Sequence, residues 1–123
     1  MLRVAVAQLN AVLGDLAGNV ARIADFAERA KALGADVLLT PELALCGYPP
    51  EDLLLRPDFY RACDAALDEL AARVEGITLV VGHPEEEAGR RYNAASVLEN
   101  GQRRALYRKV RLPNYEVFDE KRY

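Results

Sequence analysis

Two charged side chains stand where apolar, strand-like runs of this sequence end. Glu42 follows Pro41 directly after the run at residues 36–40, and Lys109 ends the second half of a hairpin pattern. A strand end is a usual position for a catalytic group, because a rigid element there hands over to a loop. A carboxylate in such a place can transfer protons, and an ammonium can stabilise developing negative charge.

Each of these residues also has a simpler interpretation. A glutamate beside proline at a strand end more often serves a turn or a helix dipole. Lys109 lies in the arginine-rich stretch 103–111, and a run of charges is usually a solvated surface. Residue type and position alone leave both alternatives open.

Other reactive side chains are few. The sequence has two cysteines, Cys46 and Cys63, and a single histidine, His83. These numbers argue against a disulfide framework, a thiolate metal site, a histidine-based zinc site and a Ser-His-Asp triad. Cys46 lies in a loop four residues after Glu42, whereas Cys63 falls on the inward stripe of a predicted helix and is interpreted as a core residue. Neither common glycine-rich phosphate loop occurs.

The composition fits one folded domain. The chain has 123 residues, of which 51% are hydrophobic and 28% are charged, and this excludes a disordered tail or a collagen-like repeat. The net charge of −3 argues against a nucleic-acid binder that neutralises phosphates in bulk. No apolar run approaches the roughly 18 residues of a membrane span, and the N-terminus lacks a secretory pattern. We therefore expect a cytoplasmic protein that binds neither nucleic acid nor membrane.

The strands that must position Glu42 and Lys109 are marked by apolar and β-branched runs. Asn100-Gly101 predicts a tight hairpin turn, since both residues tolerate positive φ. The stretch 83–91, with three consecutive glutamates, is predicted to be a surface loop. Strands are predicted over residues 2–9, 36–40, 77–81, 92–98 and 102–109, the first three of them buried.

Helical spacing of apolar residues predicts two helices, over residues 20–33 and 57–74. The loop 41–56 is rich in proline and holds at most one helical turn, at 51–55. Residues 111–123 show no periodicity. The resulting order β-α-β-α-β-β-β is typical of an α/β layered domain.

Three motifs extend the prediction beyond fold class. They are VAVAQLN at 4–10, TPELALCGYPPEDLL at 40–54 and YRKVRLPNYEVFDEKRY at 107–123. Together they resemble the nitrilase-type glutaminase domain of the glutamine-dependent NAD synthetases, over essentially the whole chain. The resemblance implies an αββα carbon–nitrogen hydrolase sandwich, of which residues 1–123 would be the N-terminal part, and L-glutamine as the substrate.

The resemblance also implies a Glu-Lys-Cys triad. Glu42 and Lys109 match its first two members. In this chemistry a thiolate attacks the glutamine side-chain amide, and the glutamate takes the thiol proton and later protonates the departing ammonia. The lysine ammonium stabilises negative charge on the carbonyl oxygen.

Three further positions match the family's site. Glu120 corresponds to a second glutamate that orients the lysine or the substrate, although Glu116 and Asp119 are close rivals. Tyr115 matches a tyrosine that contacts glutamine, and Tyr48 is expected to line the pocket or the ammonia exit. A core or rim aromatic is the competing interpretation for both tyrosines.

The nucleophile is the main departure from the family pattern. The family's cysteine follows the second long motif by a few tens of residues, whereas this sequence ends at Tyr123, inside that motif. Cys46 occupies a loop position where the family has small residues, so we do not expect it to be the nucleophile. The 123-residue chain is therefore expected to be inactive alone.

The family's complete enzyme passes ammonia to a C-terminal synthetase domain, which uses ATP and Mg²⁺ to convert deamido-NAD into NAD. The resemblance thus implies that domain as a partner, a homo-oligomeric assembly, and no cofactor bound by residues 1–123. A free-standing nitrilase-like amidase and a non-catalytic fold fragment are the alternative functions.

Overall fold

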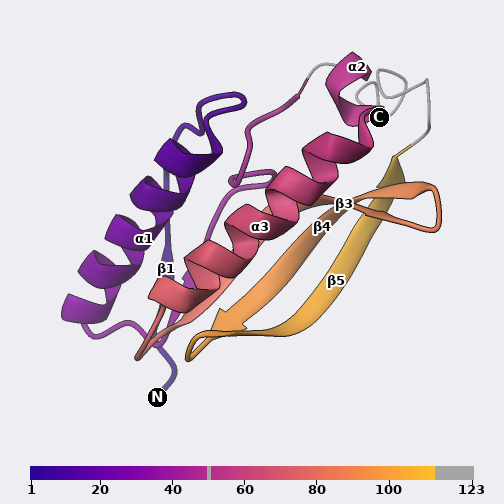
Figure 1. Cartoon of the computed structure of the whole chain (residues 1–123). Helices are drawn as coiled ribbons and strands as arrows, with labels where there is room; N and C mark the ends of the chain where they lie inside the picture. Colours follow the sequence, from indigo (N-terminus) through magenta and orange to yellow (C-terminus); the bar gives the residue numbers. More distant parts are fainter. Residues whose placement is uncertain (50, 113–123) are drawn as a thin grey trace.

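The computed structural model describes residues 1–49 and 51–112. Their strands form one mixed sheet in the order β1-β2-β3-β4-β5 (Figure 1). The strands are β1 (Val4–Val6), β2 (Val37–Leu39), β3 (Thr78–Glu87), β4 (Arg90–Glu99) and β5 (Gln102–Leu112). The helices are α1 (Leu16–Ala32), α2 (Glu51–Leu54) and α3 (Pro57–Arg73).

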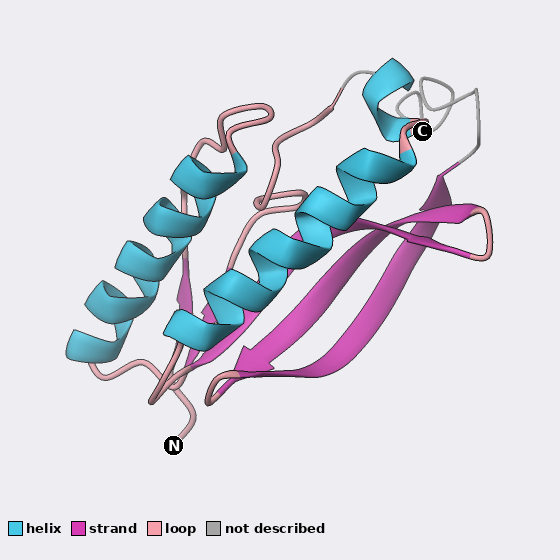
Figure 2. Cartoon of the chain, in the orientation of Figure 1, coloured by secondary structure: helices cyan, strands magenta, loops and turns pink. Residues whose placement is uncertain are grey.

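The sheet has a parallel half and an antiparallel half. β1, β2 and β3 run parallel, because a helix connects each of them to the next. β3, β4 and β5 form an antiparallel ribbon. The long helices α1 and α3 lie side by side over one face of the sheet (Figure 2). The described residues therefore form one helical layer on one sheet, which confirms the predicted α/β class.

The core lies between that sheet face and the helices. Leu79 and Val81 alternate along β3 toward the helices and are fully buried. Five residues predicted to face inward from α3 are buried with them: Phe59, Cys63, Ala66, Leu67 and Leu70. Burial of this apolar stripe is what holds the helical layer on the sheet.

The other sheet face is open in the described part of the chain. Val6 and Tyr107, at opposite edges of the sheet, are each 67% exposed. Val4 and Leu39 are also exposed there, so the prediction that the first strand is buried on both faces is wrong. That strand is also shorter than predicted, since it spans Val4–Val6 rather than residues 2–9.

The predicted loop at 83–91 is also wrong, because β3 continues to Glu87 and β4 begins at Arg90. The turn between them has positive φ at Ala88 and Gly89, as a tight hairpin requires. Arg91 of β4 pairs with Glu86, and Arg108 of β5 pairs with Glu85 and Glu87. Because these arginines neutralise the three glutamates, the glutamates can lie on paired strands. The Asn100-Gly101 hairpin is confirmed, with φ of 50° and 80°.

The helices differ from prediction mainly at their ends. α1 begins at Leu16 rather than at residue 20, because Asp15 caps it by accepting a hydrogen bond from the Gly18 amide at 3.0 Å. The single turn α2 and the start of α3 at Pro57 agree with prediction. Within residues 1–49 and 51–112, none of the helices combines the length and apolar character needed to cross a membrane.

Candidate active site

Glu42 and Lys109 meet in the folded chain. The Lys109 Nζ atom lies 3.5 Å from the Glu42 Oε2 atom, inside the distance of about 5 Å over which opposite charges affect each other appreciably. The two side chains are 40% and 44% exposed, so they are accessible without being fully solvated. One comes from the loop after β2 and the other from β5, and the fold brings them together across 67 positions of sequence.

The turn that carries Glu42 is tightly hydrogen-bonded. The Ala44 amide donates to the Pro41 carbonyl at 3.1 Å, and the Gly47 amide donates to the Leu43 carbonyl at 2.8 Å. Leu43 adopts a φ of +53°, a conformation that costs a side-chain-bearing residue of order 1 kcal/mol. Its buried side chain is part of the core, and this packing holds the strained backbone in place.

Lys109 sits on a β-bulge. Asn93 of β4 pairs with Val110 and Ala94 pairs with Arg108, so Lys109 is the extra residue in the register of the described strands. A bulge interrupts the alternation of a strand and re-aims a side chain. Past the bulge, β5 runs on to Leu112, three residues beyond the predicted end at Lys109.

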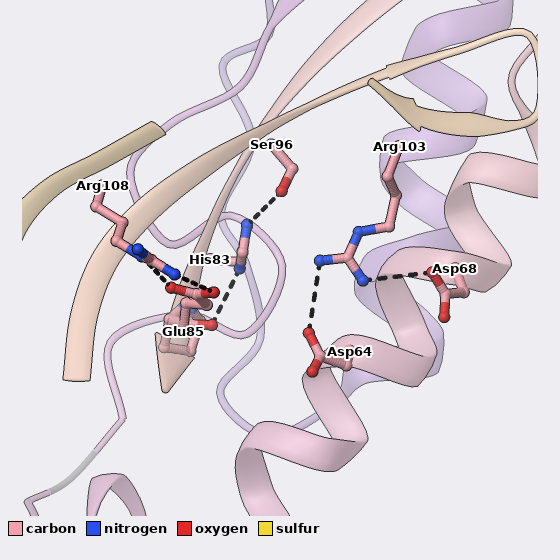
Figure 3. Close-up of polar contacts among 8 residues, drawn as sticks. Asp64, Asp68, His83, Glu85, Ser96, Arg103 and Arg108 are labelled. Atoms are coloured by element: carbon pink, nitrogen blue, oxygen red, sulfur yellow. Dashed lines mark hydrogen bonds and ion pairs between the residues drawn. The ribbon is translucent and has the colours of Figure 1, made fainter. Parts of the chain in front are cut away.

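The residue before Lys109 is anchored firmly. Arg108 donates two hydrogen bonds to Glu85, at 2.6 and 3.1 Å (Figure 3). It also pairs with Glu87 at 3.1 Å. Its guanidinium also lies 4.9 Å from the ring centroid of Tyr92. These contacts fix β5 next to the bulge, so the backbone that carries Lys109 is held in place.

Tyr48 contacts the second oxygen of the same carboxylate. Its hydroxyl donates to Glu42 Oε1 at 3.0 Å. The Glu42 carboxylate therefore has Tyr48 on one oxygen and the Lys109 ammonium on the other. Partial burial of the hydroxyl, and then its hydrogen bond to Glu42, raise the pKa of Tyr48 above its usual value near 10. The phenol therefore keeps its proton at neutral pH and donates a hydrogen bond to Glu42, although its ring is largely exposed.

A cleft of about 290 Å³ adjoins Glu42 and Tyr48. Its walls are the loop after β1 and the loop after β2, and its lining consists of Leu9, Asn10, Ala11, Pro41, Glu42, Leu43, Ala44, Gly47 and Tyr48. A small amide is compatible with a space of this size.

Asn19 of α1 fastens the two walls of this cleft together. Its fully buried amide donates to the Val12 carbonyl at 2.8 Å and to the Leu45 carbonyl at 3.0 Å, and it accepts from the Val12 amide at 2.9 Å. Asn19 was not among the site residues predicted from the sequence. The available signal was a polar amide next to the apolar stripe of a helix.

Cys46 is close to Glu42 in sequence but is completely buried. Its thiol donates to the Gly47 carbonyl at 3.0 Å. A hydrogen bond with Cys63 and then burial raise the pKa of the Cys46 thiol far above its ordinary value. Because the thiolate is the nucleophilic form, this environment agrees with the expectation that Cys46 is not the nucleophile.

Two predicted site residues, Tyr115 and Glu120, lie outside the described residues, and their roles stay predictions. Among residues that the structure does describe, no group of three or more His, Cys, Asp or Glu could hold a metal ion. Lys109, Glu42 and Tyr48 are thus the predicted site residues that the described fold brings together.

Nearly the whole chain matches a known protein family. The family described as carbon-nitrogen hydrolase matches residues 3–123. The chain belongs to this family. This match confirms the resemblance inferred from the motifs, and the Glu42–Lys109 pair of this carbon-nitrogen hydrolase lies inside the matched region.

Curated relatives of this carbon-nitrogen hydrolase are longer proteins. The glutamine-dependent NAD(+) synthetase of Xylella fastidiosa is 52% identical over 123 residues, covering 99% of this chain and 23% of that protein. The synthetase of Thermotoga maritima is 44% identical over 124 residues, covering 99% of this chain and 21% of its own length. The chain therefore spans less than a quarter of these two relatives.

Solved structures confirm the fold. The glutamine-dependent NAD(+) synthetase of Cytophaga hutchinsonii superposes with a TM-score of 0.85 at 33% identity, covering 95% of this chain and 21% of that one. An amidase of Nesterenkonia sp. superposes with a TM-score of 0.76 at 33% identity, covering 94% of this chain and 46% of the amidase. In one structure of that amidase, acrylamide is added at an active-site cysteine.

Proposed function

We propose that this chain is the glutamine-binding part of a glutamine-dependent NAD synthetase. Its reaction is hydrolysis of the glutamine side-chain amide, which supplies ammonia for the ATP-dependent amidation of deamido-NAD. The observation that carries the proposal is the 3.5 Å contact between Glu42 and Lys109 beside a cleft, in a chain that resembles such synthetases over its whole length.

Each residue has a defined task in this reaction. Glu42 takes the proton of a cysteine thiol supplied from beyond residue 123, and the sulfur attacks the amide carbon of glutamine. Lys109 donates a hydrogen bond to the carbonyl oxygen as negative charge develops there. Glu42 then gives its proton to the leaving nitrogen, so that ammonia departs and a thioester remains. Glu42 next takes a proton from a water molecule, whose oxygen attacks the thioester carbon. The carbon–sulfur bond then breaks to release glutamate, and Glu42 returns the proton to the cysteine sulfur.

Tyr48 supports the same carboxylate. Its hydroxyl holds Glu42 Oε1 while Lys109 approaches Oε2, and these two contacts fix the plane of the carboxylate beside the cleft. Glu120 and Tyr115 complete the proposal, the first by orienting Lys109 or the substrate and the second by contacting glutamine.

ATP and Mg²⁺ belong to the synthetase region of the proposed whole protein. Among the described residues, no group of three or more His, Cys, Asp or Glu could hold Mg²⁺, and the proposal assigns both ATP and Mg²⁺ to that other region. Homo-oligomeric assembly stays a prediction of the family resemblance. Cytoplasmic location stays a prediction from the sequence, which has neither a membrane-span pattern nor a secretory pattern.

A second function is favoured by a specific observation. The Nesterenkonia amidase shares this fold at a TM-score of 0.76, and nearly half of it is covered by this chain. A free-standing amidase acting on a small amide would use Glu42 and Lys109 in the same way. The two functions differ in the acceptor of ammonia and in the preferred amide.

The deciding experiment uses the full-length protein with Glu42→Gln and Lys109→Ala variants. Each variant should lower glutamine-driven NAD formation by at least about 100-fold, the usual contribution of a positioned acid–base group. NAD formation from ammonium salt should be unchanged, because it bypasses amide hydrolysis. Exposed Glu28 on α1 gives the matched control, Glu28→Gln, which should behave as wild type. Hydrolysis of acrylamide in preference to glutamine, with no NAD formed, would replace the synthetase with the amidase.

A further inference from the structure

The end of β2 is fastened to β3 by one hydroxyl group. Thr40 Oγ1 donates to the Val80 carbonyl at 2.9 Å and accepts from the Gly82 amide at 3.2 Å. The Thr40 amide also donates to the Val80 carbonyl, at 3.1 Å. This residue lies two positions before Glu42, so these bonds fix the point from which the Glu42 turn departs.

The turn then passes directly over Gly82. A Cβ atom at position 82 would lie 2.6 Å from the Leu43 amide nitrogen, 2.7 Å from the Pro41 carbonyl oxygen and 3.1 Å from the Glu42 Cα atom. All three are backbone atoms, so no side-chain rotation could relieve the contact. The Leu45 amide donates to the Gly82 carbonyl at 3.1 Å and holds the far side of the same turn.

We infer that Thr40 and Gly82 are positioning residues that set the place of Glu42 relative to Lys109. This inference rests on the proposed function. Thr40 fixes where the turn begins, and the missing side chain at Gly82 lets the turn lie against β3. Neither residue lines the cleft or contacts Glu42's carboxylate. Their effect is exerted through the backbone of residues 41–43.

The expected consequence is a loss of rate rather than of substrate affinity. A displacement of about 1 Å in a catalytic group can cost on the order of 100-fold in rate. The cleft is walled by two loops, and its first wall, residues 9–11, is not touched by either change. We therefore expect kcat for glutamine to fall while KM stays nearly constant.

The first test compares Thr40→Val with Thr40→Ser in the full-length protein. Valine keeps the shape but loses the hydroxyl, whereas serine keeps both hydrogen bonds. Thr40→Val should lower kcat for glutamine hydrolysis by roughly tenfold or more with KM within about twofold. Thr40→Ser should restore kcat to within about threefold of wild type. Equal kcat values in Thr40→Val and wild type would overturn the inference.

The second test compares Gly82→Ala with Gly89→Ala. Gly89 lies in the turn that follows β3, with φ of +77°, and a Cβ there meets nothing within 4 Å. Both changes should lower the melting temperature, Gly89→Ala through backbone strain alone. Only Gly82→Ala should reduce kcat, by about 100-fold. An equal loss of kcat in both variants would reduce the effect to instability and overturn the inference.

Failure of the proposed function would look different. In that case Glu42→Gln would retain glutamine hydrolysis. If Glu42→Gln is inactive while Thr40→Val and Gly82→Ala match wild type in kcat, the proposed function stands and the positioning role is wrong. Should Gly82→Ala fail to fold, the Thr40 pair decides alone.

Discussion

Arg108 and Lys109 are neighbours in β5, yet they pair with carboxylates from different parts of the sheet. Arg108 forms a two-point contact with Glu85 of β3, and Lys109 reaches Glu42 beyond the end of β2. The bulge at Lys109 makes this divergence possible, because it places an extra residue between two paired positions. The arginine thus holds the strand from which the lysine projects.

This relationship predicts an effect of Arg108 on stability. Arg108→Gln removes both ion pairs and leaves Glu85, which is only 13% exposed, without its cation. We expect a lower urea midpoint and a lower melting temperature. Arg104, the extra residue of the other irregularity in β5, is the matched control, since its pair with Glu99 is longer, at 3.8 Å, and more exposed. An equal effect of Arg104→Gln would contradict the anchoring role.

Tyr48→Phe removes the hydrogen bond to Glu42 Oε1 and keeps the ring. We expect glutamine hydrolysis to slow by roughly three- to tenfold, in line with a hydrogen bond worth about 0.5–1.5 kcal/mol. Tyr107→Phe, on the open sheet face, provides a control and should leave the rate unchanged. Steady-state kinetics on the full-length protein measures both, and an unaltered rate in Tyr48→Phe would remove Tyr48 from the site.

The raised pKa of Tyr48 has a defined consequence at high pH. The folded state holds the phenolic proton more tightly than the unfolded state, whose tyrosine titrates near 10. The contribution to stability is therefore complete below pH 10 and is lost as pH rises through the folded value. Ultraviolet titration should show that this tyrosine ionises above pH 10 in the native protein, and Tyr48→Phe should delete that transition.

The buried His83 leads us to expect that the folded chain loses stability in acid. His83 belongs to β3 and is fully buried; its Nδ1 donates to the Pro84 carbonyl, and its Nε2 accepts from the Ser96 hydroxyl of β4 (Figure 3). A carbonyl can only accept, and this contact assigns the proton to Nδ1. Burial lowers the pKa of His83 below its ordinary 6.5, despite the opposing effect of the Pro84 carbonyl.

The sign of that dependence follows from proton binding. Below pH 6.5 the unfolded chain binds a proton at His83 that the folded chain resists, so unfolding becomes easier as pH falls toward the folded pKa. Above pH 6.5 this contribution to stability is fully present. Urea midpoints measured between pH 5 and pH 7.5 should decline toward acid in wild type and decline less in His83→Gln. Parallel curves for the two proteins would contradict the assignment.

Asn19→Ala should loosen both walls of the cleft. The change leaves the buried Leu45 carbonyl and the Val12 backbone groups without their partner, at a cost of about 2–3 kcal/mol. Urea unfolding measures this loss, for which the exposed Gln102→Ala in β5 serves as the control. A stability change within about 0.5 kcal/mol, typical of an exposed position, would show that the two loops do not depend on Asn19.

Local patterns predicted much of the fold because they reflect local causes. Apolar spacing located both long helices, and Asn100-Gly101 located its hairpin, since each depends on neighbouring residues. The stretch 83–91 was misassigned because its glutamates are neutralised by arginines from other positions, such as Arg108. That partnership exists only after folding.

The candidate site was likewise predicted in part from the sequence. The resemblance placed Glu42 and Lys109 together, and their distance agrees with that prediction. The bulge at Lys109 and the close approach over Gly82 carry no signal of their own in a single sequence, and the clamp by Asn19 shows only as a polar amide next to an apolar helix stripe. Each arises where two segments that are distant in sequence pack together.

The two halves of the sheet impose an order on folding. β3, β4 and β5 are consecutive and joined by two-residue turns, so their contacts close quickly. The parallel pairing of Val4 with Val37, and of Val37 with Thr78, must first close long helical crossovers. Lys109 belongs to the fast half, whereas Glu42 is placed by the slow one. During refolding, the antiparallel ribbon of β3, β4 and β5 should therefore form before the ion pair between Glu42 and Lys109. A chain that has formed only this ribbon has Lys109 in place on β5, while Glu42 is not yet beside it.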